Sequence, residues 1–104
     1  MKVMWCWRCR MDVPMLDDEE FARLHDLYRA AFGKEGVPVD DRFQEVRNVY
    51  HQMTGFYEPN HNAIMHHQIS IYGPPCGNRG KPLRTPQAAF CAACGKVSEA
   101  HPVR

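Results

Sequence analysis

The sequence predicts a small α+β domain in which a helical hairpin is joined to a metal-binding lobe built from the two ends of the chain. Three observations predict this class: the chain has only 104 residues, two central segments have apolar residues at helical spacing, and a Cys-x-x-Cys pair lies near each end. So short a chain buries little apolar surface, and a metal ion held by the cysteines would add stability. We therefore expect a single domain over residues 1–104.

Residues 1–16 form the predicted N-terminal knuckle, which contains the first pair, Cys6 and Cys9. The segment from residue 11 to residue 16, with Pro14 in it, has the composition of a short extended exit from this knuckle.

The first helix of the hairpin is expected over residues 17–32. Asp17 and Glu20 have the spacing of a capping box, and apolar residues recur at helical spacing from Phe21 to Phe32. Gly33 is suited to end this helix, because glycine is the preferred residue just past a helix C-terminus.

The second helix is expected to begin at Asp40 or Asp41, the latter with Gln44 at the capping-box position, and to end at Gly55. The two helices lie within residues 17–57. Each must bury an apolar stripe, and the other helix is the nearest surface, so we expect them to pack as a hairpin.

The remaining chain, residues 58–98, is expected to form a strand and a second knuckle lobe. Residues 63–67 suit a single helical turn, and residues 68–72 alternate polar and apolar as in a strand. Short strands are expected around Leu83 and Phe90. Residues 99–104 are expected to be a frayed tail.

Charge is unevenly distributed, although the net charge is only +1. Residues 1–10 carry three basic residues and no acid, and residues 76–104 carry five basic residues against one acid. Residues 11–75 carry five basic residues against eleven acids. We therefore expect a basic metal-binding lobe opposite an acidic helical lobe.

The chain contains no apolar run long enough for a signal peptide or a membrane span, so a cytoplasmic location is expected, with no membrane partner. Thiols stay reduced in that compartment, and five cysteines, an odd number, fit metal binding with one spare thiol better than a disulfide framework. A structural Zn²⁺ ion is the expected cofactor, since four thiolates suit tetrahedral zinc.

The segments Cys76 to Leu83 and Phe90 to Gly95 resemble a zinc ribbon, in which each half reads C-x-x-C-G and is followed by a hairpin. The second half is complete at Cys91 and Cys94, but Arg79 stands where the first half needs a cysteine. A guanidinium that keeps its proton is no zinc ligand.

The N-terminal pair can replace the missing ligand, although Arg10 stands where a knuckle usually has glycine. The predicted zinc ligands are therefore Cys6, Cys9, Cys91 and Cys94, with Cys76 as a remnant. A competing set consists of Cys76, Cys91 and Cys94 with one N-terminal cysteine or a histidine. Iron bound as in rubredoxin is a further alternative, but that family's surrounding pattern is absent.

Two sets of residues are candidates for partner contacts. Trp5 and Trp7 flank Cys6 and point to the same side of an extended segment, where they either contact a partner or pack over the metal site. The second set is the carboxylates near the two predicted helix starts, which either cap and solvate the helices or fill a basic cleft on a partner. Its members are Asp17, Asp18, Glu19, Glu20, Asp40 and Asp41.

No catalytic residues are expected. His61, His66 and His67 form a cluster that suggests a second metal site or a general base, but they lack a carboxylate at a recognisable spacing and are interpreted as surface or capping residues. Cys76 has no identifiable base. The hypothesis is therefore a non-enzymatic, zinc-stabilised module that binds a protein and no small-molecule substrate.

The chain also resembles small bacterial proteins that share a Cys-Trp-x-Cys start, a segment like His66 through Cys76, and the run Lys81 to Pro86. This resemblance implies an immunity or antitoxin role, in which the protein covers the active cleft of a toxin. The alternative is a zinc-ribbon protein that binds nucleic acid, with basic residues on phosphates and tryptophans on bases. The acidic middle of the chain opposes that alternative.

Overall fold

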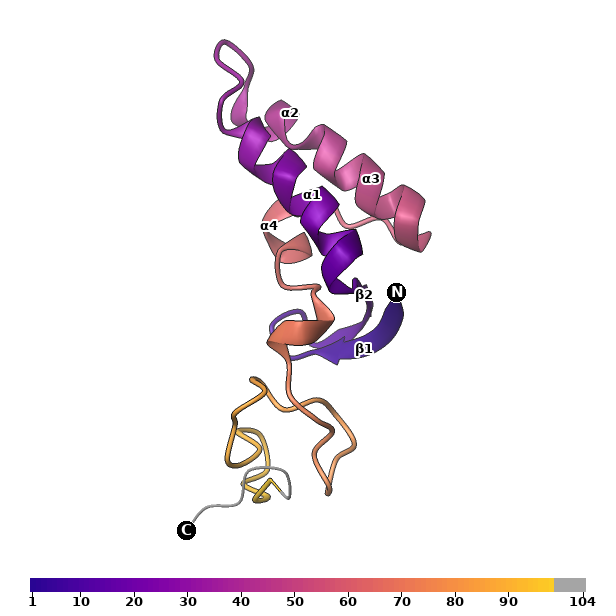
Figure 1. Cartoon of the computed structure of the whole chain (residues 1–104), viewed down its shortest axis with the longest axis vertical. Coiled ribbons are helices and arrows are strands. Elements are labelled where there is room, and N and C mark those ends of the chain that lie inside the picture. Colours follow the sequence, from indigo (N-terminus) through magenta and orange to yellow (C-terminus); the bar gives the residue numbers. More distant parts are fainter. Residues whose placement is uncertain (99–104) are drawn as a thin grey trace.

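The computed structural model describes residues 1–98, and the tail expected at 99–104 lies outside that range. A two-stranded antiparallel sheet comes first, and short helices and turns follow it (Figure 1). The elements are β1 (Lys2–Cys6), β2 (Met11–Met15), α1 (Asp18–Ala31), α2 (Val39–Arg42), α3 (Gln44–Thr54), α4 (His61–Ile64) and a 3₁₀ turn (Ile69–Ile71). The predicted α+β class is confirmed.

Helix α1 begins as predicted. The Glu20 N–H donates to Asp17 Oδ1 over 2.8 Å, and the Asp17 N–H donates to Glu20 Oε1 over 3.0 Å, which completes the capping box. Its C-terminus differs in one detail: the cap is Phe32 in a right-handed conformation, so the helix ends without a left-handed glycine.

The second predicted helix is broken into α2 and α3, so the expected capping box of Asp41 and Gln44 is wrong. Phe43 interrupts the helix with φ −98° and ψ 5°. Its buried ring lies parallel to the His61 imidazole, with 3.9 Å between the ring centroids, so a tertiary contact is made at the break. Gly55 ends α3 at φ 75°, as predicted.

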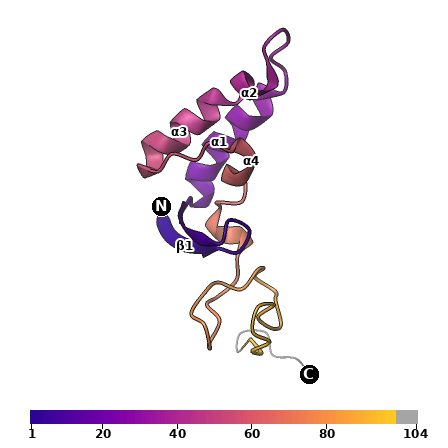
Figure 2. The same cartoon turned by 180° about the vertical axis from the view of Figure 1, so that it is seen from behind.

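Helices α1 and α3 lie side by side, and α4 packs beside them (Figures 1 and 2). Their shared core contains Leu16, Leu24, Ala31, Phe43, Val46, Val49, Tyr50 and Ile64. The sheet lies beyond the N-terminal end of α1, and the C-terminal turns lie beyond the sheet. The expected helical hairpin is therefore the main apolar body of the molecule.

The strand expected at residues 68–72 is wrong, because residues 69–71 form a 3₁₀ turn. Only Gln68 pairs with the sheet region, in a single parallel bridge to Leu16. Leu16 N–H donates to the His67 carbonyl over 2.8 Å, and Ile69 N–H donates to the Leu16 carbonyl over 2.9 Å. These two bonds bring His67 next to the N-terminal knuckle.

The strands expected near Leu83 and Phe90 are reduced to isolated pairs, Pro75 with Pro82 and Phe90 with Val97. Proline has no N–H to donate, which keeps the first ladder from extending. Two small clusters replace a core in this half of the molecule. One consists of Cys6, Val13, Met15 and Tyr72, and the other of Cys76, Leu83 and Cys91. None of the described helices is long and apolar enough to cross a membrane.

Candidate metal centres

Three turns of the chain have the same backbone geometry. In each, the N–H of the fifth residue donates to the carbonyl of the first over 2.7 Å, and the fifth residue has positive φ. The turns are Cys6 to Arg10, Cys76 to Gly80 and Cys91 to Gly95, with φ of 57°, 71° and 79° at their last residues. Each starts with a cysteine, and the flanking backbone also pairs in the same register. The structure thus repeats one metal knuckle three times.

Arg10 adopts in the first knuckle the left-handed conformation that glycine has in the other two. A side chain in this region costs about 1–2 kcal/mol relative to glycine. The sequence departs from the C-x-x-C-G pattern at Arg10, but the turn itself is kept.

The N-terminal group consists of Cys6, Cys9 and His67, whose possible ligand atoms all lie within 4.8 Å of one another. Cys6 and His67 are fully buried, and Cys9 is partly buried. Cys9 Sγ lies 3.4 Å from His67 Nε2. Two ligands on one zinc ion, with bonds of about 2.3 Å to sulfur and 2.0 Å to nitrogen, would be separated by about 3.5 Å. The geometry therefore fits a shared metal ion.

The hydrogen bonds of Tyr50 determine which nitrogen of His67 is free. The Tyr50 hydroxyl donates to the Pro14 carbonyl over 2.6 Å and lies 2.9 Å from His67 Nδ1. Because a hydroxyl has one hydrogen, His67 Nδ1 must carry the ring proton and donate it to Tyr50. Nε2 then presents its lone pair to the cysteines, which is the arrangement of a metal-bound histidine with a partner behind it.

Burial keeps Cys9 and His67 neutral when no cation is bound. It lowers the pKa of His67 to about 4, and burial together with the neighbouring Cys6 raises the pKa of Cys9 to about 11. Neutral imidazole is the ligand form of histidine, whereas a divalent cation would draw the proton from each thiol. The group thus has ligands of the kind that zinc takes.

The C-terminal group consists of Cys76, Cys91 and Cys94, whose sulfur atoms also lie within 4.8 Å of one another. Cys76 Sγ and Cys94 Sγ are 3.5 Å apart, close to the roughly 3.8 Å expected for two thiolates on one zinc ion. Burial alone would raise the pKa of Cys91, but backbone N–H groups of Cys94 and Ala93 outweigh it, and the pKa falls to about 7. This knuckle therefore favours a thiolate before any metal binds.

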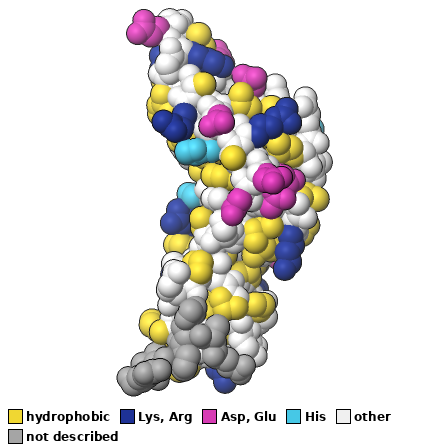
Figure 3. Space-filling view, viewed as in Figure 1, with side chains coloured by type: hydrophobic (Ala, Val, Ile, Leu, Met, Phe, Trp, Pro, Cys, Tyr) yellow, Lys and Arg dark blue, Asp and Glu magenta, His cyan; other side chains and the backbone are white. Residues whose placement is uncertain are grey.

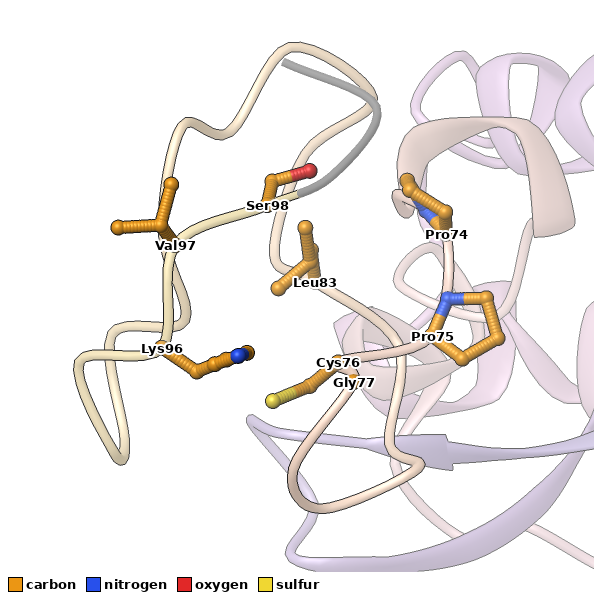
Figure 4. Close-up of a pocket in the computed structure, with 8 residues that line it drawn as sticks. All are labelled: Pro74, Pro75, Cys76, Gly77, Leu83, Lys96, Val97 and Ser98. Atoms are coloured by element: carbon orange, nitrogen blue, oxygen red, sulfur yellow. The ribbon is translucent and has the colours of Figure 1, made fainter. Parts of the chain in front are cut away.

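A cavity adjoins the C-terminal group on the side of Cys76 (Figure 4). Pro74, Pro75 and Leu83 line it, together with Lys96 and Ser98 from the last knuckle. The Cys76 and Lys96 side chains extend toward the same space in Figure 4. Cys76 and Cys91 are buried beside this cavity, and Cys94 is exposed.

Arg79 occupies the position of a fourth thiolate in the C-terminal group. Its turn, Cys76 to Gly80, has the same hydrogen bond as Cys91 to Gly95, so the substitution leaves the backbone of the knuckle in place. The Arg79 side chain lines a hollow beside Trp5 and Trp7. Each group therefore has three protein ligands among residues 1–98.

The four predicted ligands are divided between these two groups. Cys6 and Cys9 lie with His67, and Cys91 and Cys94 lie with Cys76. The competing set foreseen from the sequence already contained the three C-terminal cysteines. The interpretation of His67 as a surface or capping residue is wrong, because its side chain is fully buried beside Cys9. The sequence could not place it there, because the pairing with Leu16 that positions it is a tertiary contact.

The other two histidines of the predicted cluster, His61 and His66, have different surroundings. His61 stacks on Phe43 and lies 3.3 Å from Arg47, with its Nδ1 facing the guanidinium. Burial and the positive charge of Arg47 lower the pKa of His61. Burial and Arg8 lower the pKa of His66.

The predicted acidic contacts lie at opposite ends of the helical body, because α1 starts beside the sheet and α2 lies at its far end (Figure 1). Several are engaged within the protein: Asp17 and Glu20 cap α1, Asp18 accepts from Gln68, and Asp40 pairs with Arg47. Carboxylates are spread over the helical part of the face in Figure 3. They do not form one cluster.

Trp5 and Trp7 both face one hollow, as their spacing indicates. Lys81 Nζ lies 3.6 Å from the centroid of the Trp5 ring, and the Arg84 guanidinium carbon lies 4.3 Å from that of Trp7. The N-terminal knuckle and the C-terminal lobe therefore meet through cation–π contacts. The two ends of the chain are joined at this surface, and their cysteines lie in separate groups.

Comparison with known proteins identifies no relative. No family model matches the chain, and neither a curated protein nor a solved structure matches it.

Proposed function

We propose that this chain is a non-enzymatic binding module, shaped by zinc, that docks onto a protein partner. The observation that carries the proposal is the surface where the two chain ends meet. Trp5 and Trp7 project from one metal knuckle, and Lys81 and Arg84 come from the other lobe. Tryptophan and arginine are the residues that contribute most at protein interfaces, and rigid support reduces the entropy lost on binding.

The cysteines, His67 and His61 support binding over catalysis, because each lies in a possible metal-ligand group or is stacked within the fold. The five cysteines are divided between two metal-ligand groups, and His67 belongs to the first of them. His61 is stacked on Phe43. In the finer form of the proposal, the protein is a bacterial immunity protein or antitoxin that acts in the cytoplasm and covers the active cleft of a toxin.

The test is affinity capture of the tagged, zinc-loaded protein from the organism that encodes it, followed by reconstitution with the purified partner. We expect one protein to bind in a fixed ratio and to be lost when zinc is removed. For the finer proposal, that protein is a toxin whose activity falls when this chain is added. Recovery of nucleic acid alone, or of no macromolecule, would contradict the proposal.

A second candidate function is nucleic-acid binding, favoured by the basic residues beside the two tryptophans. It ranks lower because Lys81 and Arg84 already cover faces of the indole rings on which bases would stack. The eleven acidic residues between positions 11 and 75 also repel a polyanion. Strong, salt-dependent binding to a random single-stranded oligonucleotide would reverse this ranking.

A further inference from the structure

Arg79 stands at the position of a metal ligand in its knuckle turn but contributes to a different surface. The turn that contains it keeps the geometry of a metal knuckle, yet its side chain lines the hollow between the two lobes. The complete lining of that hollow is Trp5, Trp7, Arg10, Arg79, Lys81, Arg84 and Ala93. Four cations thus line one concave surface, and no acidic side chain is among its lining residues.

The positive charge of this hollow is not neutralised within the described part of the chain. The ion pairs among residues 1–98 involve the N-terminus, Lys34 and Arg47, and none involves a cation of the hollow. Arg10, Arg79 and Arg84 are exposed. Like charges held close together repel one another, so an anionic ligand that enters the hollow relieves this repulsion.

The backbone is held by hydrogen bonds at two of these four basic residues. Arg10 and Arg79 lie in two of the three equivalent knuckle turns, whose 2.7 Å hydrogen bonds fix the chain around them. Lys81 and Arg84 are held against the indole rings. The backbone at Arg10 and Arg79, and the side chains of Lys81 and Arg84, are therefore positioned before a ligand arrives, which lowers the entropic cost of binding.

The shape of the site favours carboxylates carried on a peptide over a nucleic-acid strand. Trp5 and Trp7 each have a cation on a ring face, so these faces are not free for bases. Arginine side chains bind carboxylates through paired N–H groups. The carboxylate-rich helical lobe of the same chain would repel a long polyanion more than a short acidic segment.

We propose that the hollow lined by Trp5, Trp7, Arg10, Arg79, Lys81 and Arg84 receives an acidic segment, rich in Asp and Glu, of a protein partner. This inference rests on the proposed protein-binding function and specifies the chemistry of the partner.

The test uses the full zinc-loaded chain and a labelled short peptide rich in Asp and Glu. The comparison peptide has Asn and Gln in their place, and a single-stranded oligonucleotide is the third probe. Arg79→Glu and Arg84→Glu reverse charge in the hollow, and Arg23→Glu makes the same change at an exposed position on α1. Trp5 and Trp7 are the only tryptophans in the chain, so their fluorescence reports directly on the hollow.

We expect the acidic peptide to bind, to change tryptophan fluorescence, and to lose affinity as salt is raised. Each charge reversal in the hollow should weaken binding at least about tenfold, while Arg23→Glu changes it much less. If a variant fails to fold, the tryptophan fluorescence of the unaltered chain still compares binding of the acidic peptide, the amide peptide and the oligonucleotide.

Three results would overturn the inference: equal binding of the amide peptide, an equal loss with Arg23→Glu, or tighter binding of the oligonucleotide than of the peptide. The inference also fails, while the proposed function stands, if a captured protein partner binds both hollow variants as well as the unaltered chain. If no protein is captured but the peptide results hold, the proposed function fails and the preference of the hollow for carboxylates remains.

Discussion

The N-terminal and C-terminal metal-ligand groups share a knuckle geometry but are built into the fold in different ways. Cys9 and His67 are 58 positions apart in the chain, and His67 is tied to helix α3 through Tyr50. Cys76 and Cys94 are only 18 positions apart, and Cys94 is exposed. The first group therefore links the sheet to the helical body, whereas the second closes only its own lobe.

This difference indicates at which of the two groups a bound metal ion contributes more to the stability of the fold. Cross-linking distant segments removes more freedom from the unfolded chain than closing a short loop. Each knuckle lobe also has a core of only three or four buried residues. We therefore expect metal at the N-terminal group to be required for the order of half the molecule, and metal at the C-terminal group to be required locally.

The largest expected effect comes from Cys9→Ser. It removes a thiolate from the N-terminal group and should lower the free energy of unfolding by at least about 3 kcal/mol, because structural zinc contributes much of the folding energy of small domains. Metal analysis should show one zinc ion fewer, and thermal unfolding followed by circular dichroism should show an earlier transition.

Cys94→Ser is the matched control for Cys9→Ser, since it makes the same change in the other group. Its thermal transition for the helices should stay close to that of the unaltered chain, although one zinc ion is lost. Equal destabilisation of the helices by both variants would contradict the distinction drawn between the two groups.

Gly73→Ala is expected to have the next largest effect, and it acts on the connection between the lobes. A Cβ at this position would lie 2.3 Å from the Thr85 carbonyl oxygen and 2.9 Å from Leu83 Cβ, so the backbone must move. Because Gly73 N–H also donates to the Leu83 carbonyl, we expect a loss of about 2–3 kcal/mol, concentrated in the C-terminal lobe.

Gly33→Ala is the control for Gly73→Ala, because its added Cβ would meet only the Ala30 carbonyl oxygen at 3.6 Å, an ordinary contact. Amide hydrogen exchange separates the lobes. The Gly73 variant should exchange faster after residue 73 and keep its protection in α1 and α3, and uniform loss of protection would show that the lobes are not independent.

Tyr50→Phe tests how the N-terminal group is held. The substitution removes the oxygen that accepts the His67 Nδ1 proton and leaves the buried Pro14 carbonyl without its donor. We expect metal affinity to fall about 10- to 100-fold, as is usual when a partner behind a histidine ligand is lost. Competition with a chromophoric chelator measures the affinity.

The sequence was sufficient for those parts of the molecule that depend on local chemistry. The capping box of Asp17 and Glu20 and the left-handed Gly55 are confirmed, because each involves residues within a few positions of one another. Local signals were not sufficient at Phe43, where His61 stacks on the ring at the break in a helix that was predicted to be continuous.

The possible metal ligands show the same contrast between features set by local sequence and features set by tertiary contacts. The cysteine pairs are visible as local spacings, and each forms a knuckle turn that residues 76–80 share although Arg79 replaces the second cysteine. The choice of partners for each pair is a tertiary property, set for Cys6 and Cys9 by the backbone pairing of Leu16 with residues 67 and 69. A count of four thiolates could therefore not distinguish one shared site from two separate groups.

Arg79→Cys tests the two groups by adding a ligand instead of removing one, because it supplies a fourth possible ligand to the C-terminal group. The knuckle turn is already formed, with the Gly80 N–H bonded to the Cys76 carbonyl, so the new thiol needs no change of backbone. We expect zinc affinity at this group to rise at least about tenfold. With Co²⁺ as the probe, the thiolate-to-metal absorption should increase. Arg84→Cys is the control, because it removes another cation of the hollow at a position outside the knuckle. It should leave the metal affinity unchanged. An equal gain in metal affinity with Arg84→Cys would show that the position of Arg79 has no special relation to the metal group.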